Sequence, residues 1–158
     1  MKVDPRAVDE IVVRGHPTIT SVTGIVEPST GLQSKFSVYH SAAVAFVDAA
    51  AGIAQYSNAR ATDPLLVALR RKVKPIVDES LRKDEAYATV SAGGRKEEAH
   101  IQHASGTVDN PMTDAAIEAK FKANAIDAIG AENAKRVCDV VWSLEKLADV
   151  RELLALVA

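Results

Sequence analysis

The chain has 158 residues, of which 47% are hydrophobic and 25% charged, values that suit one globular domain with a buried core. Its formal net charge of −2 excludes a strongly basic surface for nucleic acid, and its single cysteine, Cys138, excludes an internal disulfide. We expect a cytoplasmic protein without a signal peptide or membrane span, because the longest apolar stretch, residues 42–54, is interrupted by Asp48 and is too short to cross a bilayer.

The first predicted elements are a strand, a long loop and an apolar helix. Residues 10–14 predict a short strand, whereas residues 18–34, rich in Thr, Ser, Gly and Pro, predict mostly loop. Ser37 is the expected N-cap of a helix of small apolar residues that continues to Gly52. Small residues on nearly every face indicate that this helix packs closely on several sides.

A second helix is expected between a cap at Asp63 and a stop at Pro75, with Pro64 in its first turn. Its apolar side chains recur at a spacing of four residues, at Leu65, Leu69 and Val73. This spacing is typical of an amphipathic helix that buries one face.

The clearest local signal is a β-hairpin. Residues 85–92 and 95–103 are two extended runs joined by Gly93 and Gly94. A tight two-residue turn of this kind requires positive φ, which glycine adopts at little cost. The glycine pair therefore predicts two antiparallel strands.

The remainder of the chain is predicted to be helical. Thr113 is the expected cap of a helix that closes near Gly130, a second helix carries an apolar stripe, and Asp149 is the expected cap of a last short helix. The stripe consists of Ala134, Val137, Val141 and Leu144. Together the elements predict an α+β fold in which an antiparallel hairpin-containing sheet packs against several helices. We expect a single domain over residues 1–158, because no repeat or linker is evident.

Metal and nucleotide sites are not predicted. His100 and His103 lie three residues apart on an expected strand, so their side chains should point to opposite faces and cannot share a metal ion. No metal-ligand or dinucleotide-binding motif occurs, and Gly93 and Gly94 are explained by the turn. Cys138 lies among apolar residues of an expected helix, which is typical of a buried structural thiol. We therefore expect no metal and no cofactor.

The candidate chemical surface is the segment 35–40, at the start of the first apolar helix. Free N–H groups at a helix start favour a carboxylate or a phosphate. Lys35 adds a charge, Ser37 a hydrogen bond, and His40 can transfer a proton near neutral pH. The residue types also allow a second interpretation, in which Ser37 only caps the helix, Tyr39 packs and His40 is structural.

Segment 35–40 also carries a resemblance to a known family. Its Lys-Phe-Ser sequence, before a small-residue helix ending in Asp48, is similar to the C-terminal domain of the MmgE/PrpD family. That family includes 2-methylcitrate dehydratase, cis-aconitate decarboxylase and iminodisuccinate epimerase. The resemblance covers nearly all of the chain, and the order and spacing of its pieces are specific. The other pieces are residues 10–14, Asp63-Pro64, Gly106, residues 110–113, residues 118–121, and Leu144, Glu145, Asp149, Val150 and Leu153.

The resemblance implies a small lid-type domain that closes over an active site formed mostly by a large helical N-terminal domain, which we expect to be missing here. Family members act without a metal on small di- or tricarboxylates, by removing a proton beside a carboxylate and then eliminating, decarboxylating or epimerising. His40 stands at a position that is often tyrosine in relatives, if Asp48 sets the register. The resemblance therefore implies that His40 is catalytic and that Lys35, Ser37 and Tyr39 bind substrate.

Two functions remain open. In the first, the chain is the lid of a metal-independent lyase or isomerase and is inactive alone, because stabilising the enolate-like charge needs groups from both domains. In the second, it is a non-catalytic module that binds a carboxylate metabolite or a separate helical subunit. The expected partners are the small carboxylate, the missing helical domain or subunit, and further copies of the chain, since an excised lid exposes apolar surface. Nucleic acid and membranes are not expected partners.

Overall fold

The computed structural model describes residues 3–157. They form two compact units, one ending at Asn110 and the other beginning at Pro111, and each unit is described by itself. The described part of the first unit combines a mixed four-stranded sheet with five helices, which confirms the expected α+β fold class.

The sheet has the strand order β2-β1-β3-β4. β1 pairs in parallel with β2 and antiparallel with β3, and β3 pairs antiparallel with β4. The strands are β1 (Val8–Gly15), β2 (Val73–Val77), β3 (Ala86–Ala92) and β4 (Arg95–Ile101). The predicted hairpin is confirmed as β3 and β4, and its turn residues Gly93 and Gly94 have φ values of 55° and 76°. Residues with a Cβ rarely adopt such angles, which explains the glycine pair.

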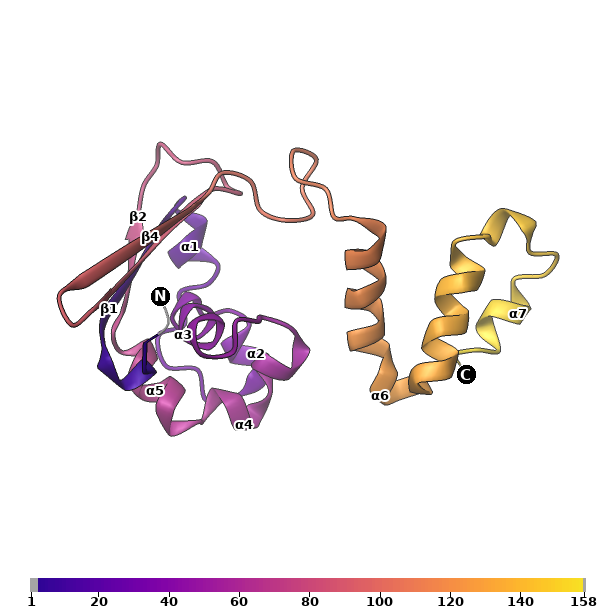
Figure 1. Ribbon diagram of the computed structural model, residues 1–158, viewed down its shortest axis with the longest axis horizontal. Coiled ribbons are helices and arrows are strands. Elements are labelled where there is room, and N and C mark those ends of the chain that lie inside the picture. The colour runs from indigo at the N-terminus through magenta and orange to yellow at the C-terminus, as the bar shows by residue number, and fades with distance from the viewer. Residues whose placement is uncertain (1–2, 158) are drawn as a thin grey trace. The chain divides into compact units, whose positions relative to one another are not determined.

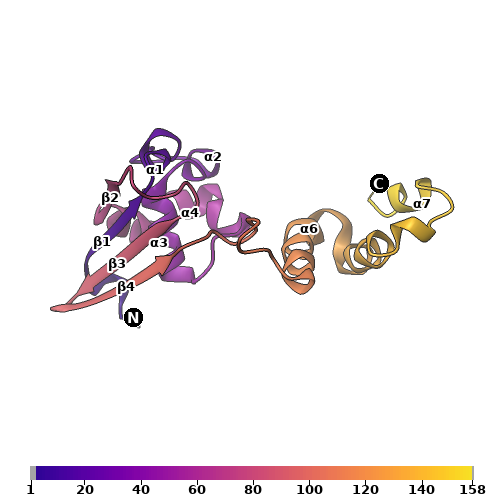
Figure 2. The same ribbon diagram turned by 90° about the horizontal axis from the view of Figure 1, so that it is seen from above.

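The helices of the first unit lie on one side of the sheet (Figure 1), and the view from above shows the same arrangement, with β3 and β4 in front of the helices (Figure 2). They are α1 (Thr18–Ser21), α2 (Gly31–Ser34), α3 (Val38–Asp48), α4 (Asn58–Ala61) and α5 (Pro64–Arg70). Two short 3-10 helices, η1 (Pro5–Ala7) and η2 (Ile53–Tyr56), complete the described elements of this unit.

The core of the first unit lies between the sheet, α3 and α5. Its buried members are Val8, Ile11, Ala43, Val44, Leu66, Leu69 and Val73. Each large aliphatic side chain in such a core stabilises the fold by about 1.5–3 kcal/mol relative to exposure. The opposite face of the sheet is polar: the guanidinium of Arg14 lies 4.1 Å from the ring centroid of Tyr87, which stacks on His100 at 4.0 Å.

The prediction that the second helix continues to Pro75 is wrong. α5 ends at Arg70, and Val73 opens strand β2, whose pairing with β1 places Val13 opposite Pro75. Val73 is buried in both interpretations, so the spacing of four could not distinguish a helix from a strand. Proline is tolerated in β2 because this strand lies at the edge of the sheet.

Two smaller differences concern the neighbourhood of α3. The segment 18–34 contains the single-turn helices α1 and α2 besides loop. α3 begins after its predicted cap, Ser37, but ends at Asp48 and not at Gly52. Ala49 adopts a left-handed conformation, with φ 51°, and its N–H donates to the carbonyl of Ala45. This main-chain closure ends the helix early.

The second unit is built on α6 (Asp114–Val141), followed by η3 (Leu144–Lys146) and α7 (Arg151–Leu154). α6 is interrupted at Gly130, whose φ of 78° and ψ of 161° are accessible essentially only to glycine. The predicted cap at Thr113 and the predicted break at Gly130 are both confirmed. Within the described residues, no helix combines the length and the apolar composition needed to span a bilayer.

Candidate functional site

The segment 35–40 forms the entry into α3, and its geometry is determined by main-chain pairing. Ser37 forms an antiparallel bridge with Gly24, and the N–H of Val38 donates to the carbonyl of Thr23 at 2.8 Å. The Ser37 hydroxyl accepts a hydrogen bond from the N–H of His40 at 3.1 Å. Ser37 therefore caps α3 as predicted, and it fixes His40 in the first turn of that helix.

His40 is the least expected feature of the segment, because its side chain is completely buried. Nε2 lies 2.9 Å from the main-chain carbonyl of Gln55, and a carbonyl can only accept, so Nε2 carries the hydrogen. Nδ1 is buried and has no hydrogen-bond partner among the described residues. The ring of Tyr56 lies 5.7 Å away, tilted by 52°. His40 thus has an unprotonated ring nitrogen that is buried and has no hydrogen-bond partner among the described residues.

Burial lowers the pKa of His40, because the charged imidazolium would lose its hydration. The Gln55 carbonyl opposes this shift by stabilising the protonated ring, while the nearby charges of Arg70 and Arg60 add to it. A histidine pKa below its ordinary range means that His40 is neutral at pH 7. A neutral ring with Nε2 protonated leaves Nδ1 as the basic atom.

A network of side-chain contacts holds Gln55, whose main-chain carbonyl orients His40. The Gln55 amide nitrogen donates to Asp48 at 3.2 Å, and its amide oxygen accepts from the N–H of Gly52 at 3.1 Å. Arg60 binds Asp48 at 2.5 Å and Asp63 at 2.6 Å, and so ties the end of α3 to the start of α5. Sequence reasoning missed Gln55 and Arg60 as neighbours of His40, because their contacts arise from loop geometry that no local pattern encodes.

The other predicted residues lie in different environments. Lys35 is exposed, and no hydrogen bond or ion pair of its side chain occurs within residues 3–157. Phe36 is 46% exposed beside it, whereas Tyr39 is half-buried and packs against the core. The structure therefore brings Ser37 and His40 into direct contact and leaves Lys35 facing solvent.

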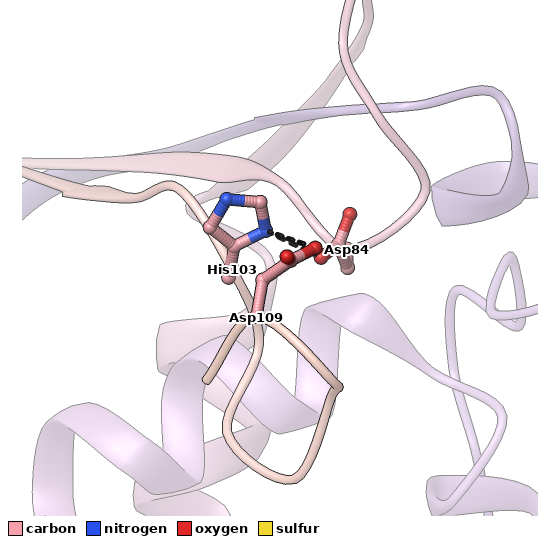
Figure 3. Close-up of side chains that lie close together, drawn as sticks. All are labelled: Asp84, His103 and Asp109. Atoms are coloured by element: carbon pink, nitrogen blue, oxygen red, sulfur yellow. Dashed lines mark hydrogen bonds and ion pairs between the residues drawn. The ribbon is translucent and has the colours of Figure 1, made fainter. Parts of the chain in front are cut away.

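A second group of polar side chains lies at the end of the hairpin, where sequence reasoning found no site. The prediction that His103 lies on the second strand of the hairpin is wrong, because β4 ends at Ile101. Nδ1 of His103 lies 2.9 Å from a carboxylate oxygen of Asp84 and 3.7 Å from one of Asp109. Figure 3 shows the ring directed toward both carboxylates. His100 instead pairs with Glu85 at 2.9 Å, so the two histidines are indeed separate.

The comparison with family models identifies the fold seen here. The model of the MmgE/PrpD C-terminal domain matches residues 1–146 of this chain. The chain belongs to the MmgE/PrpD family. The match extends from the first strand through η3 and includes the whole of segment 35–40, so the candidate site lies within the MmgE/PrpD domain. No protein of curated function matches the chain significantly.

Proposed function

We propose that this chain is the C-terminal, lid-forming part of an MmgE/PrpD lyase or isomerase, which removes a proton beside a carboxylate of a small di- or tricarboxylic acid. Family membership supports the lyase or isomerase class. The observation that carries the proposal is the buried, unpartnered Nδ1 of His40. Buried polar atoms are nearly always hydrogen-bonded, so an exception calls for a specific explanation.

In the proposed reaction, His40 is the base. Its Nε2–H is held by the Gln55 carbonyl, and Nδ1 accepts the proton from the carbon next to the carboxylate. The lowered pKa of His40, due mainly to burial, keeps the ring neutral and able to accept a proton at pH 7. Asp48, which lowers the cost of charging the ring, stabilises the imidazolium that forms. No metal ion or cofactor is required for this step.

Lys35 is the proposed contact of the substrate carboxylate, because it is an exposed cation two residues before the Ser37 cap. Ser37 supports the site by fixing the first turn of α3, and Tyr39 is the neighbouring phenol. We propose that η2 must move for a substrate to reach Nδ1, since η2 supplies both the Gln55 carbonyl and the Tyr56 ring beside His40. The chain alone is then inactive, because the groups that stabilise the developing negative charge and enclose the substrate come in part from the helical domain.

A second function is favoured by the burial of His40. In the conformation described, a solute reaches Lys35 and not His40. This difference suits a non-catalytic module that binds a carboxylate metabolite, or a separate helical subunit, through Lys35. Both functions are consistent with a reducing cytoplasm, in which the buried thiol of Cys138 persists.

Proton abstraction is tested most directly by isotope exchange. The chain is joined to a family helical domain and incubated in D2O with a panel of small di- and tricarboxylic acids, while NMR follows the loss of the C–H signal beside each carboxylate. His40→Gln should slow exchange by about 100-fold or more, the usual contribution of a general base. Exchange at the wild-type rate in a folded His40→Gln variant removes His40 from the mechanism.

The binding module is tested on the isolated chain by calorimetric titration with citrate. Lys35→Met should abolish the heat of binding, and Lys96→Met serves as the control because Lys96 is an exposed lysine on β4. Binding by the isolated chain together with no exchange activity in the joined protein favours the module. No heat at millimolar citrate argues against it.

A further inference from the structure

The group formed by Asp84, His103 and Asp109 has the donor atoms of a metal site. One nitrogen and one oxygen from each carboxylate all lie within 4.8 Å of one another. Zinc binds nitrogen and carboxylate oxygen at about 2.0–2.2 Å, which places tetrahedral donors about 3.3 Å apart. The distances from His103 Nδ1 to the two carboxylates, 2.9 and 3.7 Å, lie on either side of that value. Each of these two distances is within a few tenths of an ångström of the spacing that a tetrahedral ion requires.

The main chain holds these donors in place. The N–H of Ala104 donates to the carbonyl of Asp84 at 2.9 Å, which fastens the loop beyond β4 to the segment before β3. The Asn110 amide donates to the carbonyl of His103 at 2.9 Å, and the N–H of Gly106 donates to the carbonyl of Asn110 at 2.8 Å. The loop is thereby closed on itself around His103 and Asp109. Donors fixed by their framework lose little freedom when they bind an ion.

Charge balance also favours a divalent ion. Arg82 contacts Asp84 at 3.3 Å and Asp109 at 3.1 Å, so one guanidinium joins the same two carboxylates. A divalent ion supplies positive charge to the same two carboxylates and can therefore take the place of Arg82. Arg82 is exposed, so it can leave the carboxylates without exposing apolar surface.

We propose that His103, Asp84 and Asp109 bind a divalent transition-metal ion of the zinc class, in exchange with Arg82. Nδ1 of His103 and one oxygen of each aspartate are the ligands, and the imidazole keeps its hydrogen on Nε2. A hollow beside the site, lined in part by Ser105 and Asn110, leaves room for water to complete the coordination. The ion has a structural role: it fastens the loop that precedes the second unit, and it is independent of the chemistry proposed for His40.

The test is calorimetric titration of the intact chain with zinc chloride. We expect one site, and we expect His103→Ala to weaken it by more than about 10-fold, since even an outer partner of a metal ligand contributes about 10–100-fold. His100→Ala is the matched control, because His100 is a nearby histidine paired with Glu85, and it should leave the affinity unchanged. Circular dichroism confirms that each variant is folded.

Arg82→Gln provides the sharper test. It keeps all three ligands and removes the competing cation, so zinc should bind more tightly than to the wild type. Titration with cobalt, followed by its visible absorption, should rank the wild type and the variants in the same order of affinity. The proposal is overturned if millimolar zinc gives no binding, if His103→Ala binds as well as the wild type, or if Arg82→Gln weakens binding. Those outcomes identify the group as an ion-pair cluster only.

Discussion

His40 donates its Nε2 hydrogen to the main-chain carbonyl of Gln55, 2.9 Å away, and this contact determines the tautomer of a completely buried imidazole. The contact links the first turn of α3 to η2, fifteen residues later in the chain. It makes Nδ1 the basic atom, and it leaves that atom without a partner among the described residues. The pH dependence of stability follows from this arrangement.

The chain should lose stability as the pH falls below about 6.5, the ordinary pKa of histidine. Burial lowers the pKa of His40 in the folded state, so the unfolded chain takes up a proton before the folded chain does. Stability is therefore fully present above pH 6.5 and decreases by up to about 1.4 kcal/mol per pH unit until the folded pKa is reached. Urea denaturation at pH 7.5, 6.5, 5.5 and 5.0 measures this slope, and His40→Gln should have a smaller one. Parallel curves for the two proteins contradict the assignment.

Arg60 should be more important for stability than an exposed arginine with one ion pair. It contacts Asp48 and Asp63 and is about one-quarter exposed. Arg60→Met leaves two partly buried carboxylates without their cation, and we expect a loss of about 1–3 kcal/mol. Arg71→Met is the control, because the pair of Arg71 with Glu27 is exposed and should contribute less than about 1 kcal/mol. Equal losses in chemical denaturation show that the network contributes nothing beyond a surface pair.

Gly31 should not tolerate alanine. A Cβ at this position would lie 2.2 Å from the carbonyl oxygen of Tyr56, which is main chain and cannot rotate away. Gly31→Ala should therefore destabilise the first unit by about 2–4 kcal/mol through displacement of the segment after η2. Gly52→Ala is the control, since a Cβ there meets only the side-chain oxygen of Gln55 at 3.5 Å. A wild-type melting temperature for Gly31→Ala rejects this account of the close approach.

The chain should self-associate through the apolar side chains near Lys35. Leu32 is 68% exposed and Phe36 is 46% exposed, and Ile25, which is also exposed, donates its N–H to the carbonyl of Phe36. Exposed apolar side chains gathered in one place favour association. Replacing Leu32 and Phe36 together by serine should shift light scattering at high protein concentration toward the monomer. Val108→Ser is the control, because Val108 is almost fully exposed elsewhere. A strictly monomeric wild type contradicts the prediction.

Local signals predicted the helix caps and the hairpin because their physical causes lie within a few residues. Ser37 and Thr113 accept hydrogen bonds from N–H groups three residues ahead, as a cap requires. Gly93 and Gly94 supply the positive φ of the turn. The same reasoning failed at Val73, because its burial depends on pairing with β1, more than sixty residues earlier in the chain. A spacing of four cannot reveal a distant partner.

The sequence by itself determined the α+β class, the entry into α3 and the family resemblance, because capping, turn geometry and motif order are local properties of the chain. Only the tertiary structure decided that Lys35 faces solvent while His40, five residues later, is enclosed with an unpartnered Nδ1. It alone brought His103 to Asp84 and Asp109, because the loop after β4 folds back onto the segment before β3. Burial and convergence of side chains depend on which distant segments pack together, and the periodicity of a single segment does not contain that information.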